Sequence, residues 1–347
     1  MFNNYLFIGH EYNWVHLNIY LCLNHICQKL NNNIQIRDKT DLLPSYLLKK
    51  FHSQTQSKFI ELYYNFSETA KTYSTEDRKK FIYIFRLQNK IEQMLCNPSF
   101  WVNRNLKNIQ NLIDAAAPIT EYGFDILTNK TIGTRQAHYN FIYKKNNYCP
   151  FCGLALFNKI TVHNEDYDHY LSKESFPLAA ANLLNLIPMC QACNERHKLA
   201  QNIISERGFF RKAFYPYGKK KADISLLNST LFKLDGTPDW DIRFNPNCAE
   251  SVTWDQVFHI KLRYKDTVLE KRYSDFLDKI IGMFKMFGIS SSSTDEEIIN
   301  CLDLNIAPLI EADRQPGITF IDCKIVDLFK MNISTNPAIL PMLRSGL

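Results

Sequence analysis

Two pairs of cysteines with the same spacing lie near the middle of the chain. Cys149 and Cys152 form one Cys-x-x-Cys pair, and Cys190 and Cys193 form the other. Two thiolates at this spacing can bind one metal ion from a tight turn, and four thiolates complete the tetrahedral shell that Zn²⁺ prefers. A filled shell leaves no position for water or substrate, so the pattern predicts a structural zinc site.

Residues that could carry out hydrolysis lie between and directly after these pairs. Asp168 and His169 are adjacent, and Asn194 follows the second pair. Carboxylate and amide oxygens suit Mg²⁺ or Mn²⁺, and a neutral histidine can remove a proton from water. This combination favours phosphodiester hydrolysis, with His169 as the base and Asp168 and Asn194 as metal ligands.

Basic residues surround the same group. Lys173, Arg196 and Lys198 are close enough in sequence to bind flanking phosphates. Residues 140–221 hold 12 Lys and Arg against 6 Asp and Glu, which accounts for all of the formal net charge of +6. The excess suits a polyanionic partner, and a solvated basic face is the alternative interpretation.

The segment from Cys149 to Lys198 resembles the HNH endonucleases, or ββα-metal (His-Me finger) nucleases, that carry a four-cysteine zinc site. The matching motifs are Cys-x-x-Cys, Asp-His-Tyr-Leu, Lys-x-x-Phe-Pro, Asn-Leu-Ile-Pro and Cys-x-x-Cys-Asn, in that order. The resemblance implies a metal-dependent endonuclease that acts on nucleic acid, with DNA favoured over RNA.

The resemblance also implies roles for individual residues. His169 would be the general base at the end of the first strand, and Asp168 a magnesium ligand. Asn185 would brace the loop that joins the two strands. Asn194 stands where the family has its last histidine, which makes the chain an H-N-N variant, and His197 is close enough to assist or substitute.

Similar bacterial HNH proteins act in anti-phage or restriction systems, some of them with an ATPase that restrains them. The resemblance therefore implies an ATPase or another defence-system protein as a partner, in addition to nucleic acid. This expectation rests on the family alone.

A zinc-dependent nucleobase deaminase is one alternative function. His163 and Glu165 form an H-x-E motif which, with Pro188 and the second cysteine pair, imitates the deaminase signature. That signature places proline directly before the first cysteine, whereas Met189 intervenes before Cys190 here. It also leaves the first cysteine pair without a role.

A catalytically silent module that binds nucleic acid is the second alternative. It would keep the zinc-stabilised core and the basic surface but would not cleave. Substitution of His169 separates the two functions, because it should abolish cleavage and leave binding intact.

The elements that must position these residues follow from periodicity and turn signals. Apolar spacing predicts helices over 44–66, 76–95, 105–117 and 273–284, alternation predicts a strand over 240–246, and Thr294 and Glu297 are spaced as a capping box. We expect a mainly helical α+β protein with a ββα-metal core. The predicted domains are a helical N-terminal region (1–140), a nuclease domain with zinc knuckles (141–220) and an α+β C-terminal region (221–347).

The sequence also predicts the cellular compartment. Apolar runs are too short for a membrane span, and the N-terminus lacks the features of a signal peptide. We therefore expect a cytoplasmic protein without a membrane partner, in which the six other cysteines are buried, reduced thiols.

Overall fold

The computed structural model describes residues 4–48, 51, 53–100, 106–128, 133–159, 167–199, 201–233, 237–313 and 318–347. Contacts between Cα atoms divide the chain into two units. The first, here called the N-terminal unit, consists of Asn4–Asn147 and Phe157–Lys220. The second, the C-terminal unit, includes Tyr148–Leu156 and Lys221–Leu347. By this division residues 148–156 belong to the second unit and residues 157–220 to the first.

The N-terminal unit is built mainly from helices, with four short strands. The helices are α1 (Trp14–Asn31), α2 (Lys39–Leu42), α3 (Ser45–Leu48), α4 (Ser53–Lys71), α5 (Thr75–Gln88), α6 (Ile91–Cys96), α7 (Gln110–Thr128) and α8 (Thr134–Lys145). The 3-10 turns are η1 (His10–Asn13), η2 (Pro98–Phe100), η3 (Lys107–Ile109), η4 (Pro177–Ala179) and η5 (Leu183–Asn185), and η6 (Ala192–Lys198) is a π-helix.

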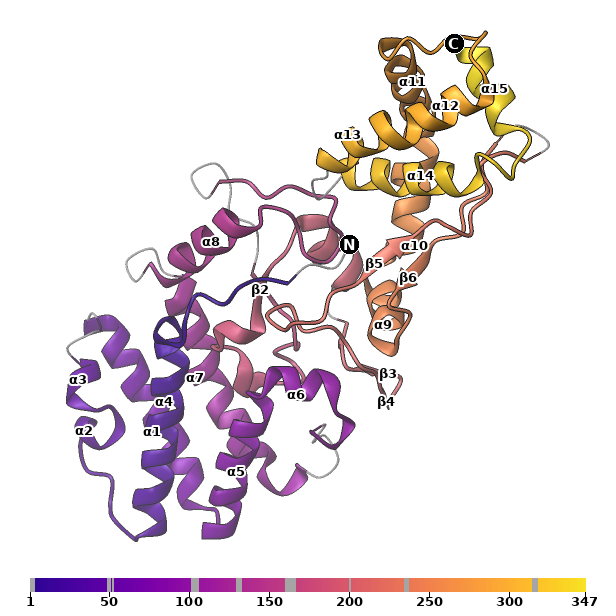
Figure 1. The fold of residues 1–347 in the computed structure, drawn as a ribbon. Coiled ribbons are helices and arrows are strands. Elements are labelled where there is room, and N and C mark those ends of the chain that lie inside the picture. Colours follow the sequence, from indigo (N-terminus) through magenta and orange to yellow (C-terminus); the bar gives the residue numbers. More distant parts are fainter. Residues whose placement is uncertain are drawn as a thin grey trace. The chain divides into compact units, whose positions relative to one another are not determined.

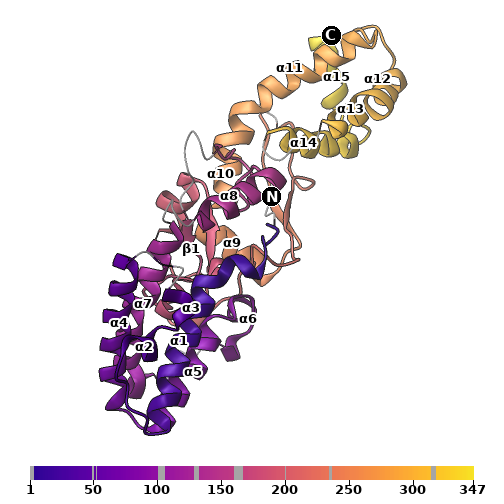
Figure 2. The ribbon, with the colours of Figure 1, turned by 90° about the vertical axis from the view of Figure 1, so that its left-hand side faces the viewer.

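Helices α1, α4, α5 and α7 lie side by side and share one apolar core (Figures 1 and 2). On α1 the buried residues Val15, Ile19, Leu23 and Ile26 recur at helical spacing, which places them on one face. At the start of α5 the Ser74 side chain accepts a hydrogen bond from the Asp77 amide and caps the helix.

The helix predicted over 76–95 is interrupted. α5 ends at Gln88 and α6 begins at Ile91. Asn89 lies in the break, and its side-chain amide donates to the carbonyls of Phe85 and Leu178. An asparagine that bonds to backbone groups competes with the helical pattern, so the periodicity predicted the face of the helix but missed its end.

Three antiparallel two-stranded sheets are present in the part of the chain that the structure describes. β1 (Tyr167–His169) pairs with β2 (Leu186–Pro188), and β3 (Ser205–Glu206) pairs with β4 (Phe209–Phe210). β5 (Asp223–Ser225) pairs with β6 (Arg243–Asn245), so the predicted strand over 240–246 is shorter than expected.

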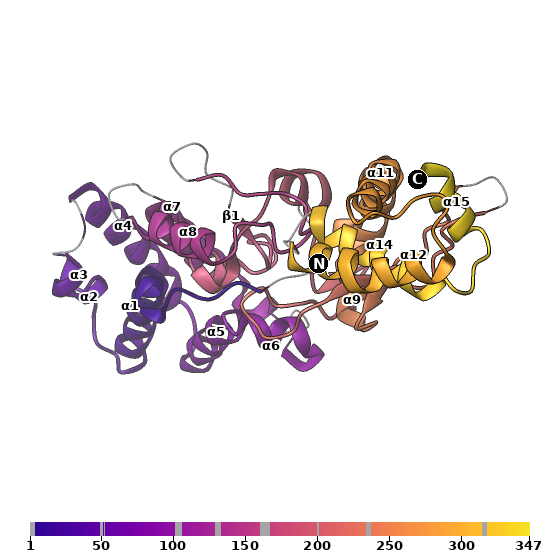
Figure 3. The same ribbon diagram turned by 45° about the horizontal axis from the view of Figure 1, so that its top comes forward.

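Helices make up most of the C-terminal unit. They are α9 (Ala249–Phe258), α10 (Ile260–Arg263), α11 (Glu270–Met286), α12 (Asp295–Cys301), α13 (Ala307–Ala312), α14 (Ile318–Asn332) and α15 (Ile339–Gly346), with π-helices η7 (Tyr264–Leu269) and η8 (Leu302–Ile306). α11 to α15 gather into one cluster (Figure 3). The predicted capping box is confirmed, since Thr294 and Glu297 bond to each other's backbone amides.

The mainly helical α+β class predicted from the sequence is confirmed. Within the described residues, no helix combines the length and the apolar character that crossing a bilayer requires.

Candidate functional site

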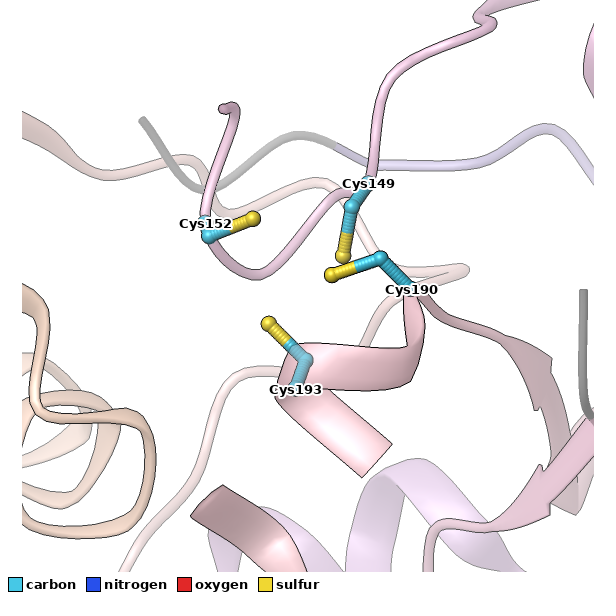
Figure 4. A group of neighbouring side chains, drawn as sticks. All are labelled: Cys149, Cys152, Cys190 and Cys193. Atoms are coloured by element: carbon cyan, nitrogen blue, oxygen red, sulfur yellow. The ribbon is translucent and has the colours of Figure 1, made fainter. Parts of the chain in front are cut away.

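The four cysteines of the two pairs come together in space (Figure 4). Their Sγ atoms all lie within 4.8 Å of one another, and all four residues are buried. Four sulfurs at about 2.3 Å from a tetrahedral zinc ion would be about 3.8 Å apart. The cluster is therefore of the right size and chemistry to hold a metal ion such as zinc.

The first cysteine pair lies on a tight turn that aromatic residues hold in place. The Gly153 amide donates to the Cys149 carbonyl over 2.8 Å, and Gly153 adopts the left-handed conformation with a φ of 64°. Trp254 Nε1 donates to the Phe151 carbonyl and the Tyr264 hydroxyl to the Cys152 carbonyl, each over 2.6 Å. The sequence alone does not identify these two aromatic residues, because nothing in their spacing connects them to residues about a hundred positions earlier.

The predicted site residues lie on a strand–strand–helix unit. Asp168 and His169 pair with Ile187 and Leu186 across β1 and β2, and His169 is the last residue of β1. Cys190 lies between β2 and η6, and Cys193 lies within η6. Because β1 pairs with β2 and η6 follows β2 closely, β1 and η6 lie near each other although they are separated in sequence.

His169 is held in one tautomer. Its Nε2 lies 3.0 Å from the Ala180 carbonyl oxygen, which can only accept, so Nε2 carries the proton and Nδ1 keeps a lone pair. The ring centroid of Phe124 lies 4.7 Å from that of His169. Burial, helped by the positive charges of Lys173 and Lys198, lowers the pKa of His169 to about 4, although the hydrogen bond to Ala180 opposes the shift. The imidazole is therefore neutral at physiological pH, as a general base must be.

Asn185 joins the two ends of the loop between β1 and β2. Its side chain is fully buried, accepts a hydrogen bond from the Leu171 amide over 2.8 Å and donates to the Leu171 carbonyl over 3.0 Å. It also lies 3.4 Å from the Ala179 carbonyl. These contacts fix the backbone next to His169 and next to Ala180, and they are of the bracing kind that the resemblance implies.

The Asp168 carboxylate is paired with a lysine. Lys198 Nζ lies 2.5 Å from Asp168 Oδ2 and donates to the His169 carbonyl over 3.1 Å. The Lys198 side chain is 1% exposed, so it does not lie on the surface as expected of a residue that binds phosphate. Burial raises the pKa of Asp168, and the charge of Lys198 opposes the shift.

This pairing bears on the predicted magnesium site. Mg²⁺ binds carboxylate oxygens at about 2.0–2.1 Å, and Asp168 Oδ2 already faces an ammonium group. In the described residues, no group of three or more His, Cys, Asp or Glu side chains other than the four cysteines is close enough to hold a metal ion. In this arrangement Asp168 does not fit a magnesium ion.

The remaining predicted residues are more exposed than Lys198. Arg196 on η6 is exposed, and Asn194 and His197 on the same helix are half-buried. Lys173 lies 3.4 Å from Glu121 of α7, with about half of each side chain exposed. A pair this exposed contributes little stability, so Lys173 can exchange Glu121 for a phosphate at small cost.

The loop between β1 and β2 is held by polar side chains of the N-terminal helices. Asn13 bonds to the Asn182 side chain and to the Leu183 amide, each over 2.9 Å. Gln88 accepts a bond from the Leu178 amide, and Thr120 donates to the Pro177 carbonyl. No local signal in the sequence identifies these residues, because their partners on the loop are far away along the chain.

His163 and Glu165, on which the deaminase alternative depends, lie outside the described residues. Both cysteines of the second pair belong to the cluster with Cys149 and Cys152, and that cluster already provides a complete set of four thiolates.

The chain matches no protein-family model, no curated protein and no solved structure.

Proposed function

We propose that this protein is an HNH-type endonuclease that hydrolyses phosphodiester bonds in nucleic acid, DNA rather than RNA. The observation that carries the proposal is the state of His169. It is neutral, it ends β1, and its Nε2 is held by the Ala180 carbonyl, so that the lone pair of Nδ1 is available as a base. A histidine in this state can remove the proton of a water molecule as that water attacks phosphorus.

The protein's own residues account for orientation and binding. The Asn185 contacts fix the loop that carries Ala180, and this loop in turn orients the His169 ring. Lys173 and Arg196 are exposed enough to contact the phosphate backbone, which would hold the strand without reading its sequence. Magnesium held by Asp168 and Asn194, which the resemblance implies, would require Asp168 to leave its lysine partner first.

Zinc at the four cysteines would be structural in this proposal. With all four positions filled by thiolates, the ion would stabilise the unit and would not touch substrate. A defence role with a restraining ATPase remains part of the proposal through the family resemblance alone. Free cleavage by the purified protein, without any trigger, would argue against such restraint.

A plasmid-nicking assay tests the proposal. Purified protein is incubated with supercoiled DNA at low salt, with Mg²⁺ or Mn²⁺ and with EDTA, because phosphate contacts weaken steeply as salt rises. We expect nicking that His169→Ala reduces by about a hundredfold or more. His10→Ala, at an exposed histidine of η1, is the matched control and should cleave like the unmodified protein.

The silent binding module stays as the second candidate because of one observation, the lysine that pairs with Asp168. Wild type, His169→Ala and Lys198→Met that all shift DNA on a gel, without any cleavage under these conditions, would establish it and refute the nuclease.

A further inference from the structure

The ion pair between Lys198 and Asp168 has unusual surroundings for a lysine. The ammonium group is almost completely removed from water, with 1% of the side chain exposed, and the Asp168 side chain is 17% exposed. A lysine is seldom buried unless a partner compensates its charge. The contacts at Lys198 Nζ are the Asp168 carboxylate at 2.5 Å and the His169 carbonyl at 3.1 Å, both on β1.

Carboxylate and carbonyl oxygens, such as those of Asp168 and His169, are also ligands that hard divalent cations prefer. A metal ion on Asp168 Oδ2 would lie within a few ångströms of Lys198 Nζ, and two positive charges at that separation in a buried site repel each other strongly. The ammonium group and a metal ion therefore exclude each other at Asp168. One must leave before the other can bind.

The backbone at Lys198 offers a way for the side chain to leave. Lys198 is the last residue of the π-helix η6, in which the Leu199 amide donates to the Asn194 carbonyl over 2.9 Å. Leu199 has a φ of 49°, a conformation that strains a residue other than glycine. A π-helix is rarely maintained unless its surroundings enforce it. Conversion of this turn to an α-helix would relax the backbone and rotate Lys198 about the helix axis.

We propose that Lys198 is a resident cation that closes the metal site of this protein, so that a divalent ion binds Asp168 only after the Lys198 ammonium has moved away. The link to catalysis rests on the proposed function. If the protein is a nuclease, a change that moves the end of η6 would activate it. Its test, however, measures metal binding and does not require cleavage.

The experiment is a Mn²⁺ titration of the full-length, zinc-loaded chain by calorimetry and by paramagnetic resonance. Lys198→Met removes the charge and keeps a side chain of similar length. Lys212→Met is the matched control, because Lys212 is exposed and its loss changes the net charge equally. We expect Lys198→Met to bind Mn²⁺ about tenfold or more tightly than wild type, since its Asp168 is left without a counter-charge. Lys212→Met should bind like wild type, and adding Asp168→Asn to Lys198→Met should abolish the gain.

Binding by Lys198→Met that is no tighter than that of Lys212→Met, with zinc content and circular dichroism unchanged, would overturn the proposal. Should Lys198→Met fail to fold, Asp168→Asn alone decides. If Lys198 closes the site, wild type binds Mn²⁺ weakly at Asp168, and Asp168→Asn changes the measured binding little. Tight Mn²⁺ binding by wild type that Asp168→Asn eliminates would overturn the proposal.

Parallel nicking assays separate this inference from the proposed function. Tighter Mn²⁺ binding by Lys198→Met without any cleavage would uphold the resident cation and count against the nuclease. Cleavage by wild type through a tight metal site that depends on Asp168 would support the nuclease. It would also refute the proposal that Lys198 closes the metal site.

Discussion

His169 is the residue whose ionisation should show directly in the activity. Burial, with help from Lys173 and Lys198, lowers its pKa from 6.5 to about 4. If it acts as the base, kcat/KM should stay flat as pH falls through 6.5 and should decline only near pH 4–5. A pH series of nicking rates, with folding checked at each pH, measures this. A decline centred near 6.5 would show that the base is a more exposed group.

Asn185 is the residue whose loss should destabilise the fold most directly. Alanine there leaves the buried amide and carbonyl of Leu171 without their side-chain partner. We expect Asn185→Ala to lower the free energy of unfolding by about 2–4 kcal/mol, measured by urea denaturation. Asn228→Ala is the control, since Asn228 is exposed, and it should change stability by less than about 0.5 kcal/mol. Equal effects of the two substitutions would contradict the bracing role.

The packing of α7 against the loop between β1 and β2 depends on a glycine. A Cβ at Gly123 would lie 2.5 Å from Ile19 Cδ1 and 3.0 Å from the Cβ of Ala181. We expect Gly123→Ala to destabilise the protein by about 1 kcal/mol or more, because overpacking outweighs the better helix propensity of alanine. Thermal unfolding followed by circular dichroism measures the effect.

Gly282 of α11 provides the matched control for this substitution. A Cβ there would meet nothing within 4 Å, and the residue is exposed. Gly282→Ala should therefore stabilise the protein by about 0.5–1 kcal/mol. If Gly123→Ala lowers stability and Gly282→Ala raises it, the results support close packing of α7 on the loop. A Gly123→Ala substitution that raises stability would rule it out.

At the scale of elements, periodicity predicted the faces of helices better than their ends. The helix expected over 273–284 is present as α11, and its buried residues Tyr273, Phe276, Ile280 and Phe284 keep helical spacing. The helix expected over 76–95 is divided because Asn89 bonds to Leu178 and to Asn182. Those partners lie some ninety residues away, and a local pattern carries no information about them.

The four-cysteine cluster should be necessary for the stability of the whole protein. We expect about one zinc ion per chain, and its removal by a strong chelator should lower the free energy of unfolding by several kcal/mol, since a site of this kind can contribute about 10 kcal/mol. Cys193→Ser should lose the metal, as measured by mass spectrometry, whereas Cys248→Ser, outside the cluster, should keep it. Unchanged unfolding after complete metal removal would refute a structural role.

Acid should also destabilise the folded chain through its buried histidines. Burial lowers the pKa of His16 and His169 to about 4 and that of His138 to about 3, from 6.5. Between pH 6.5 and about 4 the unfolded chain therefore binds protons that the folded chain does not, and stability falls as pH falls. Each histidine contributes at most about 1.4 kcal/mol per pH unit. Asp168, whose pKa is raised, acts in the opposite direction.

Urea midpoints measured between pH 6.5 and 5, with zinc content checked at each pH, test this expectation. His138→Gln should reduce the slope, because Gln cannot take up a proton in either state. His138 lies between the hydroxyls of Tyr167 and Tyr217, at 3.0 and 3.1 Å, so a glutamine can keep part of these contacts. A midpoint that does not vary with pH in this range would contradict the burial of neutral histidines.

The sequence by itself determined which residues could bind a metal ion, and it provides the proposal that His169 is a base. Cysteine spacing is a local property, and so is the position of His169 directly after Asp168. A tight turn brings two thiols together whatever the rest of the chain does, which is why the cluster could be predicted before the structure.

Only the tertiary structure decided the state of those residues. Whether Asp168 faces a metal ion or a lysine depends on where η6 places Lys198 relative to β1. Whether His169 is neutral depends on burial by Phe124 and by the loop that Asn13 and Thr120 hold. Charge compensation and desolvation are set by all neighbours in space, and most of these neighbours are far away in sequence.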